Sequence, residues 1–114
     1  MFYTVNEKIS DPRITFYGTV VDEYSQGIEG AAVEWSTSRD GGLGRIWSGT
    51  TFTNESGAFY PGPKRMRGTS LTIHKVSKEG HQTIYKPRTY RYYKDTEQRP
   101  PGPYKSTTFL LRKK

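Results

Sequence analysis

The segment that most constrains the fold runs from Ile14 to Val33 and reads I-T-F-Y-G-T-V-V-D-E-Y-S-Q-G-I-E-G-A-A-V. Its first part alternates, and the apolar or small side chains of one strand face are Ile14, Phe16, Gly18 and Val20. Residues 22–27 then supply turn formers, and Val33 and Trp35 resume the alternation. A period of two places alternate side chains on opposite faces of a strand. The segment therefore predicts a strand, a turn and a second strand.

The same pattern recurs along the chain, separated by turn formers among its 12 Gly and 7 Pro. It predicts strands over residues 14–21, 28–37, 45–53, 58–60, 70–76, 81–93 and 106–112. No window sustains the i, i+3, i+4, i+7 apolar pattern of a helix. Short strands at this spacing predict an all-β fold, a seven-stranded antiparallel β-sandwich.

A length of 114 residues suits one domain. We expect residues 1–13 to form an N-terminal arm or edge strand ending at Asp11-Pro12, and residues 14–114 to form the sandwich. The apolar fraction of 32% is low, but nine Tyr and five Phe add large buried surfaces. We therefore expect a thin core between two sheets.

The net charge of +7 is compatible with an anionic partner, such as nucleic acid, an acidic polysaccharide or an anionic surface. It is also compatible with a basic surface that has no dedicated partner, and the scatter of the charges favours this simpler interpretation. The chain has no cysteine and no apolar run long enough to span a membrane. Its first residues lack the apolar core of a signal peptide.

Three blocks of residues resemble the carboxypeptidase regulatory-like domain. The first block comprises Gly18, Val20, Asp22, Ile28, Gly30, Ala31 and Val33. The second comprises Thr53, Asn54, Gly57 and Phe59, and the third comprises Leu71, Ile73, Lys78, Gly80 and His81. The sequence departs from the family pattern at Ser25, where Gly is usual, at Gly27, where Pro is usual, and at His81, where an aromatic is usual.

This resemblance covers about residues 14–112 and implies a transthyretin-like, Greek-key sandwich whose first two strands form a hairpin. It further implies an accessory or binding module of secreted or cell-surface bacterial proteins, in an extracellular, periplasmic or cell-surface location. The family's motif residues are structural. No catalytic residue, cofactor site or metal site carries over to this chain.

The segment Thr89–Lys94 interleaves aromatic rings with cations, and its candidate ligand-binding residues are Tyr90, Arg91, Tyr92 and Lys94. Aromatic faces stack on bases or sugars while cations hold anions. If the segment is extended, Tyr90 and Tyr92 share a face, which either binds a ligand or packs into the sandwich. Lys64, Arg65 and Arg67 form a second basic segment, which is either an anion contact or a solvated loop.

Trp35 continues the apolar face of its strand and is expected in the core, whereas Trp47 is the better candidate for a surface ring. His74 and His81 are the chain's histidines, and neither has the spacing of a metal site or a catalytic triad. We expect His74 to face solvent, opposite Leu71 and Ile73.

The sequence therefore favours a non-catalytic module that binds or positions a protein or carbohydrate partner. The alternative is binding of an anionic polysaccharide or nucleic acid through the Tyr/Arg/Lys strand. No cofactor is expected.

Overall fold

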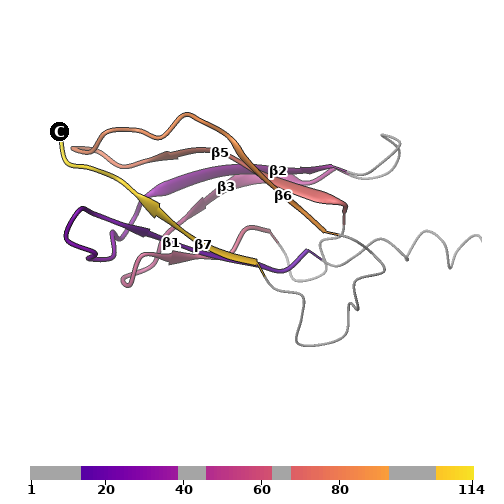
Figure 1. The fold of residues 1–114 in the computed structure, drawn as a ribbon, viewed down its shortest axis with the longest axis horizontal. Helices are drawn as coiled ribbons and strands as arrows, with labels where there is room; N and C mark the ends of the chain where they lie inside the picture. Colours follow the sequence, from indigo (N-terminus) through magenta and orange to yellow (C-terminus); the bar gives the residue numbers. More distant parts are fainter. Residues whose placement is uncertain (1–13, 39–45, 63–67, 93–104) are drawn as a thin grey trace, which may run out of the picture.

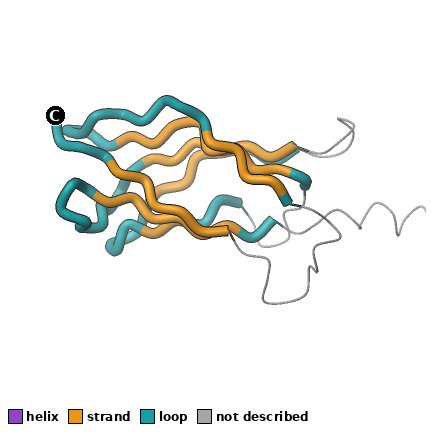
Figure 2. Tube along the Cα trace, in the orientation of Figure 1, coloured by secondary structure: helices purple, strands orange, loops and turns teal. Residues whose placement is uncertain are grey.

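The computed structural model describes residues 14–38, 46–62, 68–92 and 105–114, and these ranges form strands and loops (Figures 1 and 2). The strands are β1 (Phe16–Val21), β2 (Ala32–Ser38), β3 (Ser48–Phe52), β4 (Ala58–Phe59), β5 (Ser70–Ser77), β6 (Arg88–Arg91) and β7 (Lys105–Leu110). They form a three-stranded sheet in the order β4-β1-β7 and a four-stranded sheet in the order β3-β2-β5-β6. The all-β prediction is confirmed.

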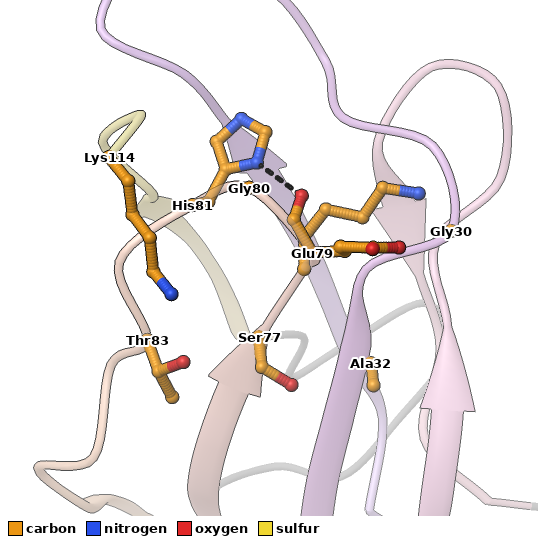
Figure 3. Close-up of a pocket in the computed structure, with 9 residues that line it drawn as sticks. Gly30, Ala32, Ser77, Glu79, Gly80, His81, Thr83 and Lys114 are labelled. Carbon is orange, nitrogen blue, oxygen red and sulfur yellow. Dashed lines mark hydrogen bonds between the residues drawn. The ribbon is translucent and has the colours of Figure 1, made fainter.

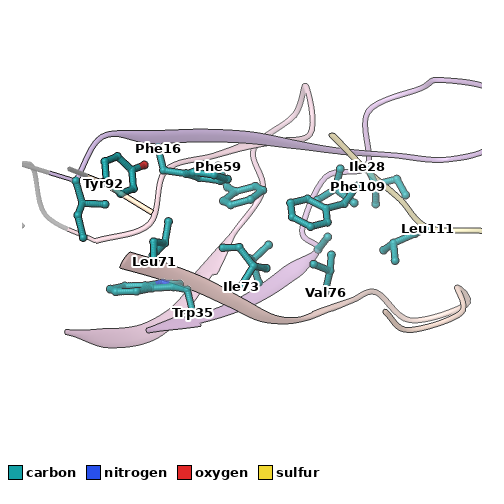
Figure 4. Close-up of a cluster of buried hydrophobic side chains, with 14 residues drawn as sticks. Phe16, Ile28, Trp35, Phe59, Leu71, Ile73, Val76, Tyr92, Phe109 and Leu111 are labelled. Carbon is teal, nitrogen blue, oxygen red and sulfur yellow. The ribbon is translucent and has the colours of Figure 1, made fainter. Parts of the chain in front are cut away.

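Side chains from both sheets meet in one apolar core (Figure 4). β1 supplies Phe16 and Val20 as its alternation predicts, and Tyr17 between them is exposed. Gly18 leaves room for the Phe59 ring, since a Cβ at Gly18 would lie 2.4 Å from that ring. Trp35 is 6% exposed, which confirms its predicted place in the core.

The predicted hairpin between the first two strands is wrong, because β1 and β2 belong to different sheets. The turn after β1 does form: the Asp22 carboxylate accepts hydrogen bonds from the backbone of Tyr24 and Gln26 at 2.8 and 3.0 Å. Ser25 adopts a φ of 64°, the left-handed conformation for which the family pattern uses glycine. After Ile28 the chain crosses to the opposite sheet, where β2 pairs with β3 and β5.

The expectation of a wholly antiparallel sandwich is also wrong. β7 runs parallel to β1, with Phe16 beside Lys105 and Val21 beside Leu110. The other pairings are antiparallel. Alternation predicts that a strand exists and which face it buries, but it does not specify the direction of a neighbour 89 residues away.

β6 is shorter than the stretch predicted over residues 81–93. Ile84 makes an isolated bridge to Val76, and the regular pairing of β6 with β5 begins at Arg88. Pro87 comes directly before it and has no N–H to donate. The predicted N-terminal arm, residues 1–13, lies outside the described residues, as do residues 39–45 and 93–104. Within the described residues, no helix has the length and apolar character needed to cross a bilayer.

Candidate functional site

The two tyrosines of the predicted ligand-binding strand face inward. Tyr92 is 2% exposed, and its hydroxyl donates a hydrogen bond of 2.8 Å to the backbone carbonyl of Thr15. Tyr90 packs partly buried against the core, with its ring centroid 4.9 Å from that of Phe16. The two rings share a face, as predicted, but this face is the core side. A ring as buried as Tyr92 offers no surface on which a ligand can stack.

Burial is also the main cause of a shifted pKa at this strand. Removal from water, and to a smaller extent the neighbouring Tyr90, raise the pKa of Tyr92 well above its ordinary value of 10.0. Tyr92 therefore stays protonated and donates to Thr15 throughout the physiological range. Its hydrogen bond ties the end of β6 to the residue that precedes β1, so Tyr92 links the two sheets.

Of the other predicted site residues, the structure describes Arg91 and Trp47. Arg91 is exposed on the opposite side of β6 from the tyrosines. Lys94, Lys64, Arg65 and Arg67 lie outside the described residues. Trp47 was expected as a surface ring, but it is half-buried and packs against the core cluster. The reason is its pairing with Thr37, whose backbone N–H donates to the Trp47 carbonyl at 2.8 Å.

A pocket of about 480 Å³ lies at the end of the sandwich where β5 turns toward β6 (Figure 3). Three segments distant in sequence form it: the entry to β2, the segment from Ser77 to Thr83, and Lys114. The turn is closed by a 3.0 Å hydrogen bond from His81 N–H to the Lys78 carbonyl, with Gly80 at a φ of 83°. The Lys114 N–H donates to the Gly80 carbonyl at 3.0 Å, which fixes the third wall.

The pocket has a basic lining. Lys78 and Lys114 contribute ammonium groups to it, and Glu79 contributes a carboxylate. The position a Cβ would occupy on Gly30 is 3.0 Å from the Lys78 ammonium, so a side chain there would crowd it. Figure 3 shows the Lys114 side chain extending toward Thr83.

His81 adds a ring nitrogen to this lining. Its Nδ1 lies 3.2 Å from the Glu79 carbonyl oxygen. A carbonyl only accepts hydrogen bonds, so Nδ1 carries the proton and Nε2 is left to accept, or to donate when the ring is cationic. Together with the hydroxyls of Ser77 and Thr83, the pocket offers several donors and two fixed positive charges to an anionic group.

A second polar pair lies on the outer face of the four-stranded sheet. The Oγ of Ser36 and Nε2 of His74 are 2.7 Å apart. In the register between β2 and β5, Glu34 lies opposite Lys75 and Trp35 lies opposite Ile73. His74 is therefore the extra residue of a β-bulge. Sequence reasoning placed His74 on the solvent face correctly. It missed the contact with Ser36, which depends on the register between two strands 38 residues apart.

This pair lacks the surroundings of a catalytic serine and histidine. Both groups are solvent-facing, and the nearby Glu34 carboxylate lies 3.7 Å from the Lys75 ammonium instead of bonding to His74. Activation of a serine requires a base that is itself oriented by a third group. Among the described residues, no three His, Cys, Asp or Glu side chains are grouped as metal ligands.

No protein-family model matches the chain. No curated protein matches it either. Solved structures do share its fold. A 3-chlorocatechol 1,2-dioxygenase from Rhodococcus opacus 1CP is similar with a TM-score of 0.62 and 16% identity, over 87% of this chain and 58% of that one.

A streptococcal ancillary pilin is similar with a TM-score of 0.60 and 13% identity, over 91% of this chain and 30% of that one. The dioxygenase domain of a dioxygenase carbohydrate-binding protein fusion from Streptomyces sp. SirexAA-E has a TM-score of 0.60 and 19% identity, over 91% and 82%. The chain thus spans just over half of the first dioxygenase and less than a third of the pilin. Identities this low show a common all-β fold and nothing about activity.

Proposed function

We propose that this chain is a non-catalytic binding module of the carboxypeptidase regulatory-like type, with the Greek-key connections of a transthyretin-like sandwich. Three blocks of its sequence support the family assignment, and the sheets of three and four strands fit that architecture. Similar folds form part of longer chains, including a pilin. This supports an accessory role, in a secreted or cell-envelope setting.

The observation that carries the proposal is the basic pocket at the end of the sandwich. Its ligand is an anionic group, namely a carboxylate, sulfate or phosphate carried by a larger molecule. Lys78 and Lys114 supply the charge, while His81, Ser77 and Thr83 supply hydrogen-bonding groups. The pocket is open to solvent, which suits recognition of a group that projects from a polymer or a surface.

The test is calorimetric titration of the chain with oligosaccharides that carry carboxylates, carry sulfates or are neutral. We expect saturable binding of one anionic probe and no binding of the neutral one. Lys78→Ala and His81→Ala should each weaken binding several-fold. Lys86→Ala is the matched control, since Lys86 is an exposed lysine outside the pocket. Equal losses in the pocket variants and the control would contradict a pocket-centred site.

A second candidate function is non-specific binding of an anionic polymer along β6. Exposed Lys86, Arg88 and Arg91 follow one another there without an intervening acidic residue, which favours it. Because the tyrosines face inward, this binding rests on charge and should fall steeply with salt. For this second function Lys86 is the test residue and Lys78 the control, so Lys86→Glu should weaken polymer binding more than Lys78→Glu.

A further inference from the structure

The outer edge of β3 has no strand partner among the described residues, because β3 ends the order β3-β2-β5-β6. On its inner edge β3 pairs with β2, where Thr53 N–H donates to the Ala31 carbonyl and Thr37 N–H donates to the Trp47 carbonyl. Hydrogen-bonded and non-hydrogen-bonded positions alternate along an antiparallel pair. Ser48, Thr50 and Phe52 therefore direct their N–H and C=O groups away from β2. No described strand pairs with them there, because β3 is the last strand of its sheet.

This edge carries none of the features that usually prevent strand addition. Natural edges are protected by charged side chains, by proline, by bulges or by being very short. β3 reads S-G-T-T-F, without charge or proline, and its pairing with β2 has no bulge. By contrast, β4 has two residues, and the opposite edge β6 follows Pro87 and carries Arg88 and Arg91. Phe52, moreover, is 63% exposed.

We propose that β3 is a self-association edge, on which the β3 strand of a second copy of this chain pairs antiparallel. In the register that centres on Thr50, Thr50 of one copy lies opposite Thr50 of the other, and Ser48 of each copy lies opposite Phe52 of the other. All three edge-facing residues then become hydrogen-bonded pairs, and each pair exchanges two backbone bonds. The two four-stranded sheets join into one continuous sheet with two-fold symmetry.

Charge favours a second copy as the occupant. A two-fold interface brings each residue close to its own symmetry mate, so a charged edge would place like charges together. The chain carries a net charge of +7, yet β3 has none, and Glu34 of the adjacent strand β2 forms a pair of opposite sign with Lys75 of β5. This part of a basic protein therefore approaches a copy of itself without direct repulsion.

The size of the contact sets its strength. Pairing of two five-residue strands buries less than the roughly 1,200 Å² at which stable interfaces begin. The dimer is therefore weak and concentration-dependent. Salt should strengthen it by screening the +7 charge of each copy, which is opposite to the effect of salt on anion binding. The inference does not depend on the proposed function.

The first test is disulfide trapping, for which the chain provides a clean background because it has no cysteine. Opposed residues of a hydrogen-bonded pair have Cα atoms about 5.5 Å apart, within the range a disulfide spans. Under mild oxidation Thr50→Cys should form a covalent dimer. The control is Thr89→Cys, because Thr89 is also an exposed threonine and lies on the other edge strand of the same sheet. Cross-linking of both variants to the same extent would overturn the proposal.

The second test is sedimentation of the unmodified chain and of Thr50→Lys over a range of concentrations and salt. Lysine at this position meets its own copy across the two-fold axis, so association should fall at least about tenfold. Thr89→Lys should associate as the unmodified chain does. Circular dichroism confirms that each variant folds. A chain that remains monomeric at its highest soluble concentration and at high salt would overturn the proposal.

Discussion

The two edge strands of the four-stranded sheet differ in what they contribute to the core. Tyr90 of β6 packs against Phe16, and Tyr92 directly after β6 bonds to the backbone of Thr15. Arg88 of β6 lies 4.8 Å from the centroid of the Phe109 ring of the opposite sheet. β3 directs only Gly49 and Thr51 inward, and Gly49 lies beneath the Trp35 ring. Large side chains attach β6 to both sheets, while β3 is held mainly by its backbone pairing with β2. One edge therefore stabilises the sandwich, and the other is available for a partner.

The largest expected effect breaks the attachment of β6. Tyr92→Ala removes a ring that is 2% exposed, and comparable substitutions of large buried side chains cost about 3–5 kcal/mol. Urea denaturation followed by circular dichroism measures the loss. The control is Thr89→Ala on the same strand, whose side chain is exposed and should cost far less. A loss from Tyr92→Ala as small as that of the control would mean that β6 is not anchored through Tyr92.

A smaller effect is expected from the hydroxyl group of Tyr92. Tyr92→Phe keeps the ring and removes the bond to Thr15, which should cost about 1 kcal/mol. It should also change the response to alkali. Unfolded tyrosine ionises near pH 10, whereas burial raises the pKa of folded Tyr92, so stability falls as the pH rises above about 10. If the unmodified chain and Tyr92→Phe lose the same stability as the pH rises above about 10, ionisation of Tyr92 does not cause the loss.

The neighbouring tyrosine should behave differently. The Tyr90 hydroxyl is buried and has no hydrogen-bond partner among the residues that the structure describes. Removing a buried polar group that lacks a partner costs nothing and relieves desolvation. Tyr90→Phe should therefore leave the free energy of unfolding unchanged or raise it by up to about 1 kcal/mol. Destabilisation equal to that of Tyr92→Phe would show that the two hydroxyls are equivalent.

The smallest effect on stability is expected at β3. Phe52 is 63% exposed, so Phe52→Ser should change the free energy of unfolding by less than about 0.5 kcal/mol. The same substitution removes the exposed ring that flanks the proposed contact and should weaken self-association. Stability and association are thus separated at this position. If Phe52→Ser unfolds the chain, the Phe52 side chain is needed for the stability of the fold, which contradicts this separation.

Sequence reasoning succeeded where the information is local. The period of two placed Phe16 and Val20 in the core, put Tyr90 and Tyr92 on one face and left His74 facing solvent. It failed for Trp47, whose burial depends on its partner Thr37 across the sheet. It also failed for the direction and the sheet of each strand, because these depend on contacts between segments distant in sequence.

The candidate pocket was beyond prediction for the same reason. No local pattern connects Lys78 and His81 with Lys114, which lies 33 residues after His81 in the sequence. They converge because His81 bridges to Lys113 and Gly80 accepts a bond from Lys114. The β3 edge, by contrast, can be recognised in the sequence, because Ser48–Phe52 is uncharged in a chain in which a quarter of the residues are charged.

The parallel pairing of β1 with β7 has a consequence for synthesis on the ribosome. β1 occupies the centre of its sheet, and one of its neighbours, β7, begins at Lys105. The four strands of the other sheet all end by Arg91, so that sheet can pair while β7 is still being translated. Throughout this interval one edge of β1 lacks its partner strand, and Phe59 lacks the Phe109 ring that packs near it. The nascent chain therefore passes through a half-closed sandwich, the stage at which strand exchange with a neighbouring nascent chain competes with correct folding.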